Sequence, residues 1–316
     1  MDPLSDVLAL LKPRSYITAG FDAGGRWALT LDDLAGRIKC YAVVKGGCWL
    51  SLGDDVAPVR LDAGDCFVLP SGREVRIGSD PHVEPRRASE VLDPTRSGAV
   101  ITYNGGGDVY LVGSRFEVSG RHAAVLLRTL PPLIQVKASG DQARLRWSIE
   151  LMMEEFREAR PGSSLIAQQL SHMMLVQALR LYLSDRAHGE TGWLAALADP
   201  QMSSAIAAMH RDPAVTWTVD ELARHVGMSR SAFAQRFRDR VGEPPIAYLT
   251  RWRMTLAGET LTHSRTTIAE VAQSFGYTSE HAFNTAFRRT MGCSPRRYAR
   301  DVAGVEHPVP EGRARR

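Results

Sequence analysis

The chain has 316 residues, of which 44% are hydrophobic and 23% are charged, and its formal net charge is +4. This composition is typical of a globular protein of two or three domains and excludes fibrous and intrinsically disordered classes. No apolar run approaches the ~18 residues that cross a bilayer, and the first residues lack the pattern of a signal peptide. We therefore expect a cytoplasmic protein that does not contact a membrane.

Charge is distributed unevenly along the chain. Residues 1–210 carry 22 basic and 24 acidic side chains, whereas residues 211–316 carry 17 basic and 11 acidic ones. All 17 basic residues of the second segment are arginine. A basic C-terminal third on a slightly acidic body suggests that this third binds a polyanion.

Residues 17–115 are predicted to form short strands separated by glycine-rich turns. The segment 38–52, "IKCYAVVKGGCWLSL", has two β-rich runs joined at Gly46 and Gly47, which predicts a hairpin. The same pattern in segment 59–77 predicts a second pair of strands, and a third pair is expected across the glycines at 105–107. Such strands favour a sandwich or a small barrel, and residues 80–98 are predicted to form a mobile loop.

The pattern changes to helical spacing after Pro131 and Pro132. Segments 141–162 and 163–185 have amphipathic periodicity and are separated by Pro161 and Gly162, so they predict a helical hairpin. The second helix has a wide apolar face made of Leu165, Ile166, Leu170, Met173, Met174, Val176, Leu179 and Leu181. This face can pack within its own domain, or part of it can form a homodimer interface within residues 141–183.

Four cysteines are present, Cys40, Cys48, Cys66 and Cys293, and none belongs to a CxxC pair. We expect reduced thiols. In the hairpin register predicted around residues 46–47, Cys40 and Cys48 lie on opposite faces of the sheet, which argues against a disulfide between them. A redox role for Cys40, Cys48 or Cys66 is an alternative that the sequence leaves open.

The segment from Thr218 to Gly242 predicts two short helices joined by a tight turn. Thr218 and Glu221 have the spacing of a capping box, and Gly227 suits the left-handed end of that first helix. The second helix, near 229–241, repeats its apolar residues every four positions and must bury them: Phe233, Phe237 and Val241. Its other face is basic and amide-bearing, which is the pattern of a helix-turn-helix unit.

A second copy of this pattern follows. Thr267 starts a helix, Gly276 makes the turn, and the next helix, near 279–290, is anchored by Phe283 and Phe287. Between the copies, the segment beginning at Pro245 predicts a helix of about 17 residues, which spans roughly 25 Å. With its flanking turns, this helix could hold two recognition helices about 34 Å apart, one turn of B-DNA.

Residues 217–254, "WTVDELARHVGMSRSAFAQRFRDRVGEPPIAYLTRWRM", and residues 268–298, which end in "GCSPRRY", resemble the AraC/XylS family of bacterial transcription regulators. The segment 192–213 resembles the stretch that precedes the DNA-binding domain in a large subgroup whose N-terminal half is a cupin-like barrel. The resemblance implies that the protein binds double-stranded promoter DNA, forms a homodimer, and has RNA polymerase and a small-molecule effector as candidate partners.

We accordingly predict a two-domain α+β protein. Residues 1–135 are expected to form a cupin-like β-barrel with an effector or regulatory role, and residues 136–195 a helical hairpin for dimerisation and linkage. Residues 196–302 are expected to form an all-α DNA-binding domain with two helix-turn-helix units, and residues 303–316 a disordered tail.

The resemblance also implies which side chains contact DNA. Base contacts are expected from Ser231, Ala234 and Gln235 in the first unit and from Glu280, His281, Asn284 and Thr285 in the second. Glutamine and asparagine can pair with adenine, glutamate can accept from cytosine, and alanine can only touch a thymine methyl group. Phosphate contacts, which position the protein without reading sequence, are expected from Arg230, Arg236, Arg288 and Arg289.

The predicted barrel lacks the histidines of metal-binding cupins. Their second motif has the spacing G-x5-P-x-G-x2-H; Gly64, Pro70 and Gly72 fit it, but Val75 stands where the histidine belongs. The first histidine pair is also missing from "KCYAVVKGG". Without imidazoles or converging carboxylates a site has little affinity for a transition metal, so we expect no metal, no cofactor and no enzymatic activity.

A barrel interior can still hold a small organic molecule. Tyr41, Trp49 and Arg73 are the candidate effector-binding residues, and an inward-facing arginine would favour an acidic effector. The alternative is that the aromatic residues fill the core and the arginine is solvated. The protein would then be a constitutive DNA-binding protein whose barrel only dimerises.

Overall fold

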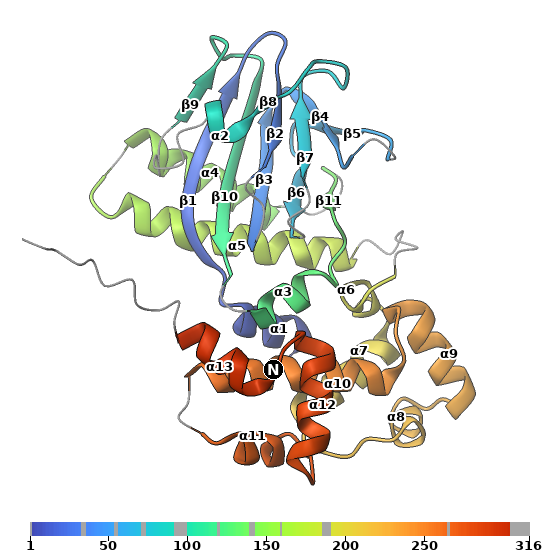
Figure 1. Cartoon of the computed structure of the whole chain (residues 1–316). Helices are drawn as coiled ribbons and strands as arrows, with labels where there is room; N and C mark the ends of the chain where they lie inside the picture. Colours follow the sequence, from blue (N-terminus) through green and yellow to red (C-terminus); the bar gives the residue numbers. More distant parts are fainter. Residues whose placement is uncertain are drawn as a thin grey trace, which may run out of the picture. The chain divides into compact units, whose positions relative to one another are not determined.

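The computed structural model describes residues 2–32, 36–53, 56–70, 74–91, 100–118, 121–138, 143–158, 160–184, 191–263 and 266–303. The chain divides into two compact units that are interleaved along the sequence (Figure 1). We call Lys12–Ser119 with Leu130–Gly189 the sheet unit. Met1–Leu11, Gly120–Thr129 and Glu190–Arg316 make up the helical unit.

The sheet unit contains two β-sheets. The six-stranded sheet has the order β11-β6-β3-β10-β1-β9, and the five-stranded sheet has the order β5-β4-β7-β2-β8. The strands are β1 (Arg14–Ala23), β2 (Ala28–Leu31), β3 (Arg37–Lys45), β4 (Gly47–Ser51), β5 (Val59–Asp62), β6 (Cys66–Leu69), β7 (Val75–Gly78), β8 (Arg86–Arg87), β9 (Val100–Tyr103), β10 (Val109–Glu117) and β11 (Ile134–Val136), with a short helix α2 (Ala88–Val91).

An apolar core fills the space between the two sheets. The strands that line this core contribute alternate residues, as the period of two in a strand requires. On β4, for example, Cys48 and Leu50 are fully buried in this core, and Trp49 between them points to the other face. Phe67, Leu111 and Ile77 contribute from other strands of the two sheets.

The three predicted strand pairs are wrong. β3 belongs to the six-stranded sheet and β4 to the five-stranded one, so the turn at Gly46 carries the chain between sheets. Strands β5, β6 and β7 also alternate between the sheets, and β1 lies between β9 and β10. Gly46 has a φ of 70°, and the carbonyl oxygen of Asp108 occupies the space that a Cβ would need. A glycine-rich turn therefore predicts that the chain changes direction, but it does not show that the two strands it joins pair with each other.

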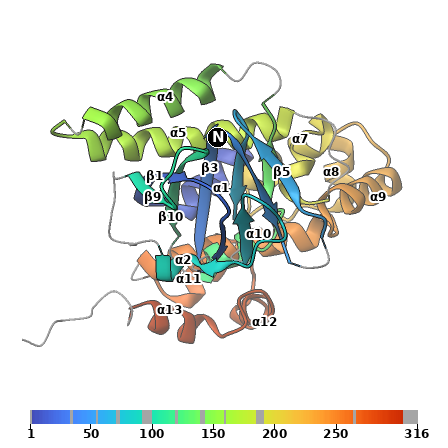
Figure 2. The ribbon, with the colours of Figure 1, turned by 90° about the horizontal axis from the view of Figure 1, so that it is seen from above.

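Two long helices cover the outer face of the six-stranded sheet, as Figure 2 shows. They are α4 (Ala143–Glu158) and α5 (Ser163–Ser184), and they confirm the predicted helical hairpin. Ser114 on β10 donates a 2.5 Å hydrogen bond to Ser171 on α5, and Phe116 packs edge-on against His172 with ring centroids 5.1 Å apart.

All four cysteines are reduced and buried. Cys40 lies in the six-stranded sheet, where it pairs with Ser114, whereas Cys48 lies in the five-stranded sheet and faces the inter-sheet core. The two thiols are therefore in different sheets and not on opposite faces of one hairpin, as the sequence predicted. The Sγ atoms of Cys40 and Cys66 are 4.0 Å apart. The hydrogen bond from Cys66 and burial raise the pKa of Cys40, and burial raises the pKa of Cys48 to about 12. Because the thiolate is the reactive form, these surroundings do not favour a redox sensor.

The helical unit is built from α1 (Pro3–Leu11), α3 (Arg121–Leu127), α6 (Trp193–Ala196), α7 (Pro200–Arg211), α8 (Val219–His225), α9 (Arg230–Val241), α10 (Pro245–His263), α11 (Ile268–Ser274), α12 (Glu280–Met291) and α13 (Pro295–Ala303). None of the described helices has the length and apolar composition needed to cross a membrane. The predicted disordered tail lies outside the described residues from position 304 onward.

Two helices of this unit come from the N-terminal half of the chain. α1 buries Leu4, Val7, Leu10 and Leu11, and it contacts α7 and α3. α3 contacts α10 and α12. The prediction that residues 1–135 form one barrel therefore does not describe the whole segment. Its helices α1 and α3 belong to the helical unit.

Candidate nucleic-acid interface

The first helix-turn-helix pair is α8 and α9. Thr218 Oγ1 accepts from the Glu221 N–H at 3.2 Å, and Glu221 Oε2 accepts from the Thr218 N–H at 2.8 Å, which is the predicted capping box. The hydrogen bonds that the Thr218 backbone N–H and hydroxyl donate to this carboxylate lower the pKa of Glu221. Gly227 has a φ of 67°, and the Ser229 side chain caps α9. The predicted pair of helices is confirmed.

The second pair, α11 and α12, repeats this construction. Thr267 and Glu270 form the same reciprocal capping box, with 2.8 Å from the Thr267 N–H to Glu270 Oε2. Gly276 has a φ of 78°, and Ser279 caps α12. Gly276 also touches the backbone of Ala214, where a Cβ would collide with the carbonyl oxygen.

Two phenylalanines anchor each second helix. Phe233 and Phe237 on α9 and Phe283 and Phe287 on α12 are all fully buried. Their ring centroids are 5.6 Å apart in α9 and 5.7 Å apart in α12. Each helix thus has one immobilised apolar face and presents the opposite face to solvent.

On α9 the expected base-reading residues share one exposed face. Ser231 and Gln235 are exposed, and Ala234 is half-buried between them. Gln235 Nε2 donates to Asp239 Oδ1 at 2.8 Å, so its amide is oriented in the free protein. Because the side chain of Ala234 is only a methyl group, this position offers DNA no hydrogen-bonding group.

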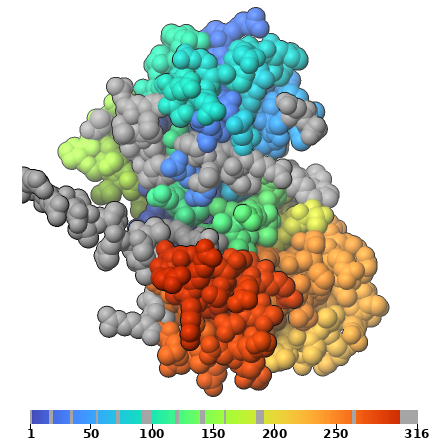
Figure 3. Space-filling model, viewed as in Figure 1, coloured from blue at the N-terminus to red at the C-terminus, as the bar shows by residue number. Residues whose placement is uncertain are grey.

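On α12 the expected base-reading residues line one groove of about 660 Å³. Figure 3 shows α12 and α13 in red as one continuous part of the exposed surface. The groove is lined by Ile268, Glu280, His281, Asn284, Thr285, Arg288, Arg289, Ser294 and Arg296. Ile268, Ser294 and Arg296 were not expected there. The signal that could have placed the last two is the "SPRR" stretch that begins α13, directly after the turn that ends α12.

The predicted phosphate-binding arginines differ in their contacts. Arg230, Arg288 and Arg289 are exposed, and within the described part of the chain no ion pair holds them. Arg236, by contrast, pairs with Asp199 at 2.7 Å and donates to Gln201 Oε1 at 2.8 Å. Asp199 caps α7, so Arg236 fastens α9 to α7 and its guanidinium group is already occupied. The contacts of Arg236 do not support the expected phosphate role.

The helix α10 joins the two pairs. It has 19 residues, which corresponds to about 28 Å of helix. Tyr248 near its start packs edge-on against Phe237 of the first pair, and Met254 and Ala257 belong to the core of the second. One continuous helix therefore contributes to both cores and sets the spacing of α9 and α12.

The candidate effector residues of the sheet unit are not brought together. Tyr41 stacks on Phe67 with ring centroids 5.3 Å apart and borders the inter-sheet core. Trp49 lies on the other face of its sheet beneath Arg60, whose guanidinium carbon is 5.5 Å from the ring centroid. Arg73 lies outside the described residues.

Val75, at the histidine position of the metal motif, is 1% exposed within the inter-sheet core. Among the residues that the structure describes, no group of three or more histidine, cysteine, aspartate or glutamate side chains is placed to hold a metal ion.

Two protein families match separate parts of the chain. The cupin family matches residues 2–184, and a helix-turn-helix domain family matches residues 222–301. A protein of Streptomyces lividans that carries the name AraC-like transcription regulator is 41% identical over 300 residues, which cover 94% of this chain and 98% of the relative. The chain belongs to the AraC-type transcription regulators.

Other relatives of this AraC-type regulator match over nearly their whole length. An AraC-like regulator of Streptomyces antibioticus is 39% identical, with 98% and 100% of the two chains covered. The RCS-specific transcriptional activator RclR of Escherichia coli is 30% identical, with 96% and 98% covered. A solved DNA-binding transcriptional dual regulator from Escherichia coli K-12 is 26% identical over 33% of this chain and 93% of its own, with a TM-score of 0.31. The helix-turn-helix family match and the two Streptomyces relatives identify this AraC-type chain as a DNA-binding transcription regulator.

Proposed function

We propose that this AraC-type regulator binds promoter DNA by placing α9 and α12 in two successive major grooves. The observation that supports this most directly is the repetition of one capped, phenylalanine-anchored helix pair on both sides of α10. The ~28 Å helix and its flanking turns are of the size needed to bridge one turn of B-DNA, about 34 Å.

The exposed faces of the two helices suggest how the contacts are divided. Ser231, Ala234 and Gln235 on α9, and Glu280, His281, Asn284 and Thr285 on α12, are the proposed base-reading residues. The exposed arginines Arg230, Arg288 and Arg289 are the proposed phosphate contacts. We add Arg296, because it lines the same groove as Arg288 and Arg289 and is exposed.

Replacing Asn284 by alanine is expected to weaken operator binding by about 1–3 kcal/mol and to relax preference at one base position. Arg288→Ala is the matched contrast on the same helix. It should weaken binding to every sequence and reduce the slope of log K against log salt by about one unit. Titrations on operator and random DNA at several salt concentrations measure both effects. Equal losses of Asn284→Ala on the two DNAs would show that Asn284 does not read a base.

We further propose that the regulator is a homodimer joined through the α4–α5 hairpin. Trp147 on α4 is 54% exposed, and Leu165 and Ile166 on α5 are 65% and 43% exposed. Large apolar side chains at such exposure favour a contact with a second copy, which would double the DNA contacts of one chain.

Leu165→Glu is expected to weaken this homodimer by about tenfold or more, because a charge would enter an apolar interface. Sedimentation analysis of the purified protein across a concentration series measures the change. Val56→Glu, at an exposed apolar residue outside the hairpin, is the matched control and should leave the dimer intact. A dimer of unchanged affinity in Leu165→Glu would rule out this end of the hairpin as the interface.

We also propose that the sheet unit binds a small organic effector. RNA polymerase is the protein partner that we propose at the promoter. Tyr41, beside the inter-sheet core, is the candidate effector residue with the best-placed side chain. Screening small molecules for a rise in melting temperature separates this function from constitutive DNA binding, because a specific ligand stabilises the folded protein by mass action.

A further inference from the structure

The helix α3 has seven residues, about two turns, and the strands before and after it in the chain both belong to the sheet unit. β10 precedes it, ending at Glu117, and β11 follows it, beginning at Ile134. The helix itself is packed in the helical unit, where it contacts α10 and α12. Ala123, Leu126 and Leu127 are buried, and Val125 packs against the core of the second helix-turn-helix pair.

His122 fixes α3 to this pair through a buried set of hydrogen bonds. Its side chain is 4% exposed, and its Nε2 lies 3.0 Å from Glu259 Oε2 on α10. Its Nδ1 lies 2.9 Å from Tyr298 Oη on α13, and its backbone N–H donates to the same hydroxyl at 3.1 Å. A neutral imidazole satisfies both ring contacts when Nε2–H donates to the carboxylate and the Tyr298 hydroxyl donates to Nδ1, and the same hydroxyl oxygen accepts from the His122 backbone N–H.

A glycine in α10, Gly258, leaves room for His122 and Tyr298. Gly258 lies within α10, where a glycine is less favourable than alanine by about 1 kcal/mol. A Cβ at this position would lie 3.2 Å from Tyr298 Oη and 3.3 Å from the Cβ of His122. The glycine therefore allows α3 and α13 to approach α10 at the same point.

Tyr298 connects this docking point to the recognition helix α12. Its ring is fully buried and packs edge-on against Phe287, with centroids 5.4 Å apart and an interplanar angle of 84°. Phe287 is one of the two anchors of α12 and precedes Arg288 directly. A displacement of α3 would thus act on a side chain that holds α12 in place.

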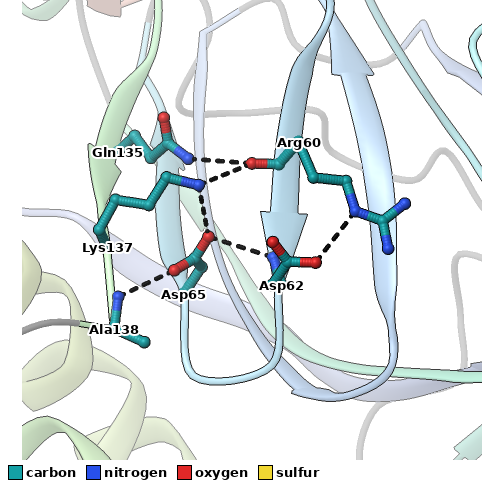
Figure 4. Close-up of polar contacts among 6 residues, drawn as sticks. All are labelled: Arg60, Asp62, Asp65, Gln135, Lys137 and Ala138. Atoms are coloured by element: carbon teal, nitrogen blue, oxygen red, sulfur yellow. Dashed lines mark hydrogen bonds and ion pairs between the residues drawn. The ribbon is translucent and has the colours of Figure 1, made fainter.

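The other end of α3 continues, after residues 128–133, into a strand that is firmly held (Figure 4). Asp65, 2% exposed in the turn before β6, accepts at 2.8 Å from the N–H of Ala138, which lies just beyond β11. Lys137 Nζ lies 2.9 Å from the same carboxylate and donates to the Arg60 carbonyl oxygen at 2.7 Å. β11 is therefore fastened to the turn between β5 and β6.

We propose that α3, docked on Glu259, Gly258 and Tyr298 through His122, is the element by which the sheet unit controls the position of α12. On this proposal the second helix-turn-helix pair is the regulated one, and the first is not. The inference rests on the proposed role of α12 in DNA binding, but its first test requires no DNA.

Tyr298→Phe tests the docking, because it removes the hydroxyl group that His122 uses twice and keeps the ring against Phe287. Hydrogen exchange of the full chain should become about tenfold faster in α3, α12 and α13 and stay unchanged in α8 and α9. His122→Ala should change the same segments, and His82→Ala, at an exposed histidine of the sheet unit, should change none of them. Unchanged exchange in α12, or equal changes in both helix pairs, would overturn the proposal.

Transmission is tested by a double-mutant cycle with Asp65→Asn, which weakens the attachment of β11. Asp65→Asn alone should speed exchange in α12, and it should have no further effect in the Tyr298→Phe background. Asp62→Asn, at a neighbouring exposed carboxylate, is the control and should be silent. If the effects of Asp65→Asn and Tyr298→Phe on hydrogen exchange in α12 are additive, or if Asp65→Asn has no effect, α3 does not couple the sheet unit to α12. Operator binding by Asn284→Ala is measured in a separate experiment. A failure of the proposed role of α12 in DNA binding can therefore be told apart from a failure of the proposed link between the sheet unit and α12.

Discussion

Phe287→Ala is expected to destabilise the second helix-turn-helix pair by about 3–5 kcal/mol and to abolish the α12 half of operator binding. The side chain is fully buried and contacts both Phe283 and Tyr298, at centroid distances of 5.7 Å and 5.4 Å. Its removal leaves a cavity at the junction of α12 and α13, which packing forces cannot close without moving α12.

Chemical denaturation and footprinting of the full chain measure the two effects of Phe287→Ala. Phe287→Leu, which keeps most of the apolar volume, should lose much less of both. Phe237→Ala is the matched variant in the first pair and should remove the α9 half of the footprint instead. A Phe287→Ala protein with the stability and footprint of the wild type would contradict the assignment of Phe287 as an anchor.

The helical unit is expected to lose stability in acid because of His210. This buried imidazole stacks on Trp252 with ring centroids 3.8 Å apart, and its Nε2 lies 2.8 Å from Tyr248 Oη. Burial, and secondarily the charge of Arg251, lower the pKa of His210 from 6.5 to about 3. Asp6 also faces the ring, with Oδ2 at 3.4 Å from Nδ1, and burial raises the pKa of this carboxyl group.

The direction of the pH effect follows from the two states of His210. Between pH 6.5 and about 3 the unfolded chain binds a proton at His210 and the folded chain does not. The contribution of His210 to the free energy of unfolding is therefore fully present above pH 6.5. It falls by roughly 1.4 kcal/mol for each pH unit between 6.5 and about 3. Denaturation of the wild type and of His210→Gln at several pH values between 7.5 and 4.5 isolates this contribution. Equal pH slopes for the two proteins would show that His210 does not titrate in this way.

The local features of the DNA-binding pairs could be predicted from the sequence because their causes are local. Thr218 with Glu221, and Thr267 with Glu270, satisfy backbone groups within four residues of themselves. The buried phenylalanines follow from spacing on a helix, and the exposed face is what remains. The resemblance to the AraC/XylS family is the basis of the DNA-contacting role that we propose for these exposed positions.

Features that depend on distant partners could not be predicted in this way. The turn at Gly46 is predicted to pair two strands, but β4 pairs with β5 and β7, and β3 pairs with β10 and β6. Arg236 looks like its exposed neighbours in the sequence, and only the position of Asp199 shows that it is occupied. The role of Tyr298 as the acceptor for His122 joins residues 176 positions apart.

The interleaved order of the two units has a consequence for synthesis on the ribosome. α1 emerges first, but α7, its partner in the helical unit, begins only at Pro200. At 5–20 residues per second, the apolar face of α1 waits roughly 10–40 seconds for that partner. The sheet unit can close during this interval, since its last helix ends at Ser184. The helix-turn-helix pairs are thus completed last, on a chain whose sheet unit has had time to fold.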